Sequence, residues 1–219
     1  MGLPFSQTEF FAVMAVYNQT VWPVQIALEV GALVIVALAL RRPPNAGAWL
    51  SAILAILWAW TGLAYHWAFF AAINPAAWAF GAICLAAGAA FAWFGVVRRR
   101  IGISPLTGAK GTLGWSLIGF ALVVYPTLGV VTGHPYPTLP TFGLPCPTTI
   151  FTVGVLLLTT RESPRAVYVV PALWSAIGAS AAFLLGVYAD LGLIVSGVVA
   201  VGAIFSGSRS TRGPAHATH

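Results

Sequence analysis

Long apolar stretches separated by short polar segments form the main pattern of this chain. Most of the stretches approach the about 20 residues that an α-helix needs to cross a hydrocarbon layer roughly 30 Å thick. The pattern predicts seven membrane spans, at residues 21–40, 48–69, 75–97, 112–133, 148–160, 166–187 and 191–207. We therefore predict an all-α, multi-pass membrane helix bundle, with one transmembrane domain over residues 1–207 and a disordered cytosolic tail at 208–219.

A further short helix is expected before the first span. Ser6 and Glu9 have the spacing of a capping box, and apolar residues follow them up to Tyr17. We interpret residues 6–19 as an amphipathic helix that lies in the membrane interface.

Composition and charge placement agree with a lipid environment. Hydrophobic residues make up 59% of the chain and charged residues only 6%, where an average soluble domain has about 25% charged residues. With seven spans, all ten Lys and Arg residues fall on one side of the membrane, which predicts an outer N-terminus and a cytosolic C-terminus. Six spans with a re-entrant fifth segment would place the last two basic clusters outside. The basic residues form no aromatic-interleaved stripe, so we expect no nucleic-acid partner.

The fifth span is unusual because it is short. Residues 148–160 give only about 20 Å of helix, and the preceding residues 133–147 contain five prolines and cannot form a regular helix. Irregular backbone at membrane depth is tolerated where it is buried in protein or lines a cavity. The segment is therefore expected to dip inward, although an outer loop above a tilted bundle is an equal alternative.

Several polar residues are candidates for a binding site or a pathway. Glu29 is an acid near the bilayer centre, and Asn18, Trp22, Gln25 and Glu29 recur at helical spacing along one stripe. The alternative for Glu29 is a neutral acid hydrogen-bonded between helices. Cys146 begins the fifth helix, and Tyr125 lies at a similar height. The predicted substrate-binding or pathway residues are Glu29, Gln25, Trp22, Tyr125, Cys146 and Tyr136.

A metal site is a second hypothesis. His66, His134, Cys146 and Asp190 all fall toward the outer side, and these residue types bind zinc or copper. None of them has paired motif spacing. In the alternative reading, Asp190 caps the last helix and His66 belongs to an aromatic belt at the interface.

The run PTFGLPCPTTIFT at residues 140–152 stands out as a signature, together with four short motifs. These are Tyr65-His66, residues 73–75 (INP), residues 173–175 (LWS) and residues 3–5 (LPF). With them, the chain resembles an uncharacterised family of small bacterial multi-pass membrane proteins, a domain of unknown function whose members are sometimes labelled transporter permeases. The resemblance implies a location in the bacterial inner membrane and assigns no catalytic residue.

Three functions follow from these patterns. The leading hypothesis is a small-solute or ion transporter with its site in the outer half of the bundle. The alternatives are a membrane-embedded, metal-dependent enzyme or redox protein, and an accessory subunit of a larger membrane complex. The last span has no lysine, which excludes a retinal Schiff base, and common nucleotide-binding and zinc-protease motifs are missing. Substrate, enzyme activity and oligomeric state stay open.

Overall fold

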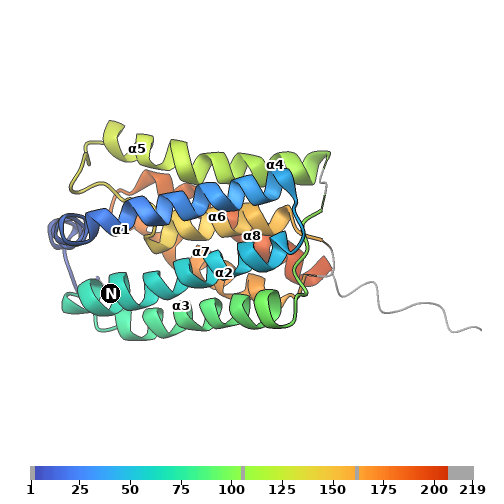
Figure 1. The fold of residues 1–219 in the computed structure, drawn as a ribbon. Coiled ribbons are helices and arrows are strands. Elements are labelled where there is room, and N and C mark those ends of the chain that lie inside the picture. Colours follow the sequence, from blue (N-terminus) through green and yellow to red (C-terminus); the bar gives the residue numbers. More distant parts are fainter. Residues whose placement is uncertain (1–2, 105–106, 161–162, 207–219) are drawn as a thin grey trace, which may run out of the picture.

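The computed structural model describes residues 3–104, 107–160 and 163–206, and within them the protein is a bundle of helices without β-strands (Figure 1). The long helices are α1 (Gln7–Arg41), α2 (Ala46–Trp60), α3 (Ala77–Phe91), α4 (Ala109–Gly119), α6 (Pro145–Leu157), α7 (Ala166–Leu184) and α8 (Leu191–Ser206). Shorter elements extend four of them: η1 (Thr61–Phe69) and η2 (Phe70–Ala72) after α2, η3 (Ala92–Val97) after α3, η4 (Phe120–Val124) and α5 (Tyr125–Val131) after α4, and η5 (Tyr188–Asp190) before α8.

These elements join into seven helical segments, as predicted. Six of the segments in the described ranges are long and apolar enough to cross a membrane, and the fifth, α6, is shorter. This is the architecture of a multi-pass membrane protein. The predicted tail at 208–219 and the basic residues Arg161, Arg209 and Arg212 lie outside the described residues.

The remaining Lys and Arg residues all lie at one end of the bundle. They lie at the C-terminal end of α1, directly after η3, and at the N-terminal ends of α4 and α7. This end of the bundle is opposite the start of α1. The membrane orientation stays a prediction from this charge asymmetry.

The first helix differs from the prediction in one respect. Ser6 and Glu9 form the expected capping box, with the Glu9 amide donating to Ser6 Oγ at 3.2 Å and the Ser6 amide donating to Glu9 Oε2 at 2.8 Å. However, the expected interfacial helix is joined to the first span in one helix of 35 residues. Figure 1 shows its first turns end-on, before α1 runs along the bundle. Pro23 lies inside α1, and a proline within a helix commonly bends it.

The short helix α6 occupies the centre of the bundle. Twelve of its residues are buried, and α2, α4, α7 and α8 pack around it. The hydroxyls of Thr149 and Thr152 donate to carbonyls one turn earlier in the helix, at 2.7 Å each, so they need no other partner. A helix enclosed by protein does not have to reach both membrane interfaces. A helix of 13 residues can therefore lie at the centre of the bundle.

Two glycines allow α4 to pack directly against α6. A Cβ atom on Gly154 would lie only 2.8 Å from the carbonyl oxygen of Gly114, and one on Gly114 would lie 2.9 Å from the carbonyl oxygen of Gly154. Such close backbone approach is typical of small residues at helix contacts in membranes. The backbones meet here because neither residue has a side chain.

The proline-rich segment before α6 is fixed to α1 by one buried amide. Asn18 is fully buried, and its Nδ2 donates to the carbonyl oxygens of Pro137 at 2.6 Å and Leu139 at 2.8 Å. Its Oδ1 accepts hydrogen bonds from Gln25 Nε2 at 2.6 Å and Thr141 Oγ1 at 3.0 Å. The amide therefore uses its full hydrogen-bonding capacity. We call Asn18, Gln25 and Thr141, together with the two carbonyl groups that Asn18 binds, the Asn18 clamp.

Beyond the clamp, the segment enters the bundle as predicted. Phe142 and Leu144 are buried, and Thr61 Oγ1 donates to the carbonyl oxygen of Gly143 at 3.2 Å. Gly143 has a positive φ of 94° and packs against Leu28, one residue before Glu29. A Cβ there would lie 2.5 Å from Leu28 Cδ1, so the Leu28 side chain would have to move, and the positive φ itself favours glycine.

Candidate functional site: a cavity at the start of α6

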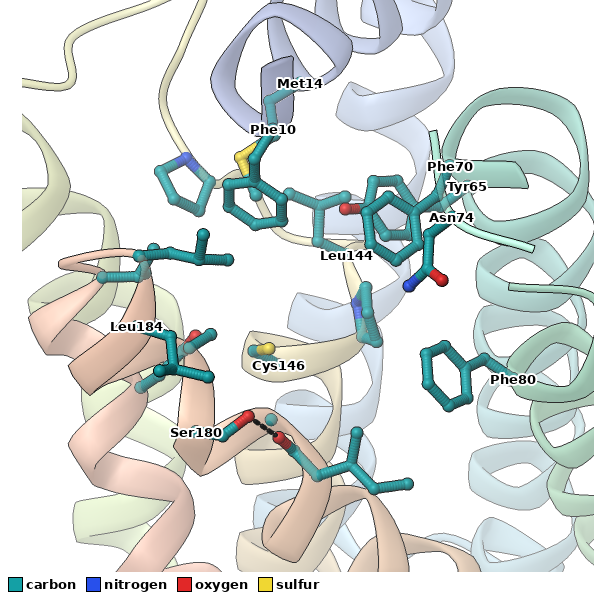
Figure 2. A pocket seen from close by; sticks show the side chains of 18 of the residues that line it. Phe10, Met14, Tyr65, Phe70, Asn74, Phe80, Leu144, Cys146, Ser180 and Leu184 are labelled. Carbon is teal, nitrogen blue, oxygen red and sulfur yellow. Dashed lines mark hydrogen bonds between the residues drawn. The ribbon is translucent and has the colours of Figure 1, made fainter. Parts of the chain in front are cut away.

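A cavity of about 150 Å³ lies at the N-terminal end of α6. Figure 2 shows Phe10 and Met14 entering it from the first turns of α1, and Ser180 and Leu184 facing Phe70 and Phe80 across it. Most of the lining is apolar. The polar lining residues are His66, Tyr65, Tyr125, Cys146, Asn74, Trp174, Ser180 and Asp190.

The π-helical segment η1 supplies two neighbouring residues to the cavity. Tyr65 and His66 are adjacent in sequence, yet both are buried. The amide of Phe70 donates to the carbonyl of Tyr65, five residues earlier, which is the wider hydrogen-bonding pattern of a π-helix. The wider turn presents both side chains to the same interior region, and such turns are frequent at functional sites.

The floor of the cavity is a polar group of three residues, Tyr125, Cys146 and Asp190, which we call the floor group. The Tyr125 hydroxyl donates to Asp190 Oδ1 at 2.5 Å, and both side chains are buried. The Cys146 thiol lies within hydrogen-bonding reach of Asp190. Tyr125 follows η4, Cys146 is in the first turn of α6, and Asp190 ends η5. Residues at the ends of three helical elements are thus brought together.

Beside the floor group, two buried side chains have polar atoms without hydrogen-bond partners. Both imidazole nitrogens of His66 are unpartnered, as is the indole nitrogen of Trp174. The two rings meet edge to face with centroids 4.9 Å apart. Gly178 leaves space for this arrangement, because a Cβ there would lie 3.2 Å from Trp174 Nε1 and 3.3 Å from Cys146 Sγ.

The structure divides the predicted pathway residues into separate places. Tyr125 and Cys146 line the cavity, whereas Gln25 belongs to the Asn18 clamp and the Tyr136 hydroxyl donates to the carbonyl of Asn18 at 3.4 Å. Trp22 lies on the outer face of α1 with 55% of its surface exposed. Glu29 is half-buried on α1 and is not among the lining residues of the cavity.

The four predicted metal ligands do not assemble. His66, Cys146 and Asp190 line the same cavity, but the His134 ring stacks on Phe11 with centroids 3.8 Å apart. Among the described residues, no three His, Cys, Asp or Glu side chains lie close enough together to hold a metal ion. The structure therefore does not bring the four predicted ligands together, because residues at a similar height in the bundle face different directions.

Sequence reasoning missed the aromatic wall of the cavity. Phe10, Phe70, Phe80 and Trp174 come from four different segments, and each is an ordinary apolar residue of a membrane helix in the sequence. The signal in the sequence was that Tyr65, His66 and Trp174 belong to the short motifs noted above. The role of Asn18 was also missed, although its place on a polar stripe was recognised.

The chain matches a family of unknown function, DUF6064, over residues 7–214, and it belongs to that family. This confirms the resemblance to an uncharacterised family. Searches of curated proteins and of solved structures each returned no match.

Proposed function

We propose that this member of the DUF6064 family is a membrane permease that binds a small solute in the cavity at the start of α6. The observation that carries the proposal is the cavity itself, whose mostly apolar lining includes His66 and Trp174 with buried polar atoms that have no hydrogen-bond partner in the protein. With the basic end of the bundle in the cytosol, this cavity belongs to the outer half, where a solute enters from outside.

The unpartnered polar atoms favour a binding role. A buried donor or acceptor without a partner costs about 1–3 kcal/mol, and native proteins retain few of them. Ligand sites combine an apolar lining with a few polar groups that fix the orientation of the ligand. A bound solute that hydrogen-bonds to His66 or Trp174 would remove this cost, so these residues are the expected contacts.

Irregular helices around the cavity favour transport over simple binding. The lining residues Tyr65 and Tyr125 lie in or directly after π-helical segments, and α7 contains Pro171. Interrupted helices surround the binding sites of many transporters, and an acid inside a membrane segment, such as Asp190, often marks a substrate pathway. These features support a site whose walls rearrange as the solute passes.

Filling the cavity is expected to stop transport. Ala181 lines the cavity from α7, so Ala181→Phe would place a ring inside it. The purified protein would be reconstituted in liposomes and tested with a panel of amines, alcohols and carboxylic acids of fewer than about ten non-hydrogen atoms, a size that suits a 150 Å³ cavity. We expect uptake of at least one chemical class by the wild type, and a loss of about tenfold or more in Ala181→Phe.

Ala176→Phe is the matched control, because Ala176 lies on the exposed face of the same helix. It should transport like the wild type. The proposal fails if no solute of the panel enters wild-type liposomes faster than empty ones. It also fails if Ala181→Phe, folded and reconstituted to the same level, transports as fast as Ala176→Phe.

A further inference from the structure

Asp190 has a buried carboxyl group without a basic neighbour in the cavity. Only 2% of its surface is exposed, and the lining formed by described residues contains no lysine or arginine. The basic residues that the structure describes lie at the opposite end of the bundle. The Tyr125 hydroxyl donates to Asp190 Oδ1 at 2.5 Å, so this hydrogen-bond partner of the carboxyl group is a neutral donor. A buried carboxylate is stabilised by a partner of opposite sign and otherwise takes up a proton.

Aromatic side chains line the same cavity as this carboxyl group. His66, Phe80 and Trp174 contact one another edge to face, with centroid distances of 4.9 to 5.7 Å. Tyr65 and Phe70 stack with centroids 5.5 Å apart on the same wall of the cavity. The faces of aromatic rings carry negative charge density and attract cations, and several rings together form the usual binding site for ammonium groups.

His66 adds a hydrogen-bond acceptor to the same wall. A neutral imidazole has one donor and one acceptor nitrogen, and neither nitrogen of His66 has a partner in the protein. An ammonium group has only donors. It can therefore bond to the Asp190 carboxylate or to the acceptor nitrogen of His66. The neighbouring donors are the Tyr125 hydroxyl, which is directed to Asp190, and Trp174 Nε1, which has no hydrogen-bond partner in the protein.

From this arrangement we infer that the cavity selects small organic cations, with Asp190 as the counter-ion and the aromatic wall around the ammonium group. This inference rests on the proposed function, because it names the class of solute for the same cavity. Size further limits the class. An engineered apolar cavity of the same volume, about 150 Å³, holds benzene. The solute is therefore an amine whose apolar part is about as large as one benzene ring.

Binding by the purified full-length protein in a nonionic detergent tests this charge preference separately from transport. Benzylamine, which is a cation at neutral pH, would be compared with benzyl alcohol, a neutral molecule of the same shape. Saturation-transfer NMR titrations would give both affinities. We expect the wild type to bind benzylamine at least about tenfold more tightly, since an ammonium group forms a charge-assisted hydrogen bond with the carboxylate and the alcohol does not. Asp190→Asn, which can still accept from Tyr125, should bind both molecules equally.

Two further variants keep the test decisive. Glu29→Gln removes a carboxyl group outside the cavity lining and should preserve the tenfold preference. Phe80→Leu should weaken benzylamine binding about threefold or more while sparing benzyl alcohol, and it substitutes for Asp190→Asn if that variant does not fold. Equal affinities in the wild type, or a preference that survives in Asp190→Asn, would overturn the cation assignment while leaving a solute site in place. If neither molecule binds to wild type, and no solute of the transport panel enters liposomes, the proposed function fails as well.

Discussion

Replacing Gly154 by alanine is expected to destabilise the bundle by roughly 3 kcal/mol or more, because overpacking against backbone cannot be relieved by rotating a side chain. The new Cβ would lie 2.8 Å from the Gly114 carbonyl oxygen and 3.0 Å from the backbone nitrogen of Ile118. Helices α4 and α6 would have to move apart. Since α6 also contacts α2, α7 and α8, the displacement would disturb packing throughout the core.

Gly119→Ala is the matched control for this prediction. Gly119 is the last residue of α4, and no atom lies within 4 Å of the position of its Cβ. Alanine there should be neutral or stabilising by up to about 1 kcal/mol, because it restricts the unfolded chain. Thermal unfolding of both variants in the same mild detergent provides the measurement. Equal melting temperatures for Gly154→Ala and the wild type would contradict the close approach of α4 and α6.

The part of this architecture that sequence predicts depends on local rules. Five prolines prevent a regular helix through residues 133–147, so the broken approach to a short fifth helix followed from the chain itself, although α6 already begins at Pro145. The six helices long and apolar enough to cross a membrane followed from apolar length in the same way. The joining of the expected interfacial helix to the first span was not predicted, because residues 6–19 were interpreted as a separate helix, whereas the structure has one helix over Gln7–Arg41.

The cavity depends on contacts between distant residues, and periodicity carries no information about them. Tyr125 and Asp190 are 65 positions apart, and their hydrogen bond exists only because η4 and η5 end at the same level of the bundle. The sequence alone predicted that Asp190 is a metal ligand or a helix cap. His66 was predicted to be a metal ligand or a residue of an aromatic belt, since the π-helical turn that buries it beside Tyr65 has no clear sequence signature.

The polar stripe of α1 shows that sequence-based prediction is limited in the same way for residues that are close together in the chain. Asn18 and Gln25 were grouped correctly, and they hydrogen-bond to each other. Trp22 is displaced from Asn18 by about 40° around an ideal helix, and that rotation is enough to direct its side chain outward. Which member of a stripe meets a neighbouring segment is determined by that segment, here the carbonyls of Pro137 and Leu139.

Those carbonyls make Asn18→Asp the most disruptive conservative change in the clamp. The substitution preserves size but replaces the two N–H donors by a carboxyl oxygen that faces the carbonyls of Pro137 and Leu139. Two buried acceptors lose their donor, and the new oxygen repels both. Each unsatisfied buried group costs about 1–3 kcal/mol, so we expect a total loss of roughly 3–5 kcal/mol. Thermal unfolding in detergent measures that loss.

Hydrogen exchange locates the effect. The backbone amides of residues 138–144 should exchange faster in Asn18→Asp than in the wild type, because the segment is no longer fixed to α1. Asn45→Asp is the same chemical change at an exposed site, where the side-chain oxygen accepts from Arg99 Nη1 at 3.1 Å and an acid can do the same. It should leave both stability and exchange unchanged. If Asn18→Asp behaved like Asn45→Asp, the proline-rich segment would be anchored by something other than this amide. The segment would then be held in place by Phe142 and Leu144, which are buried in the bundle.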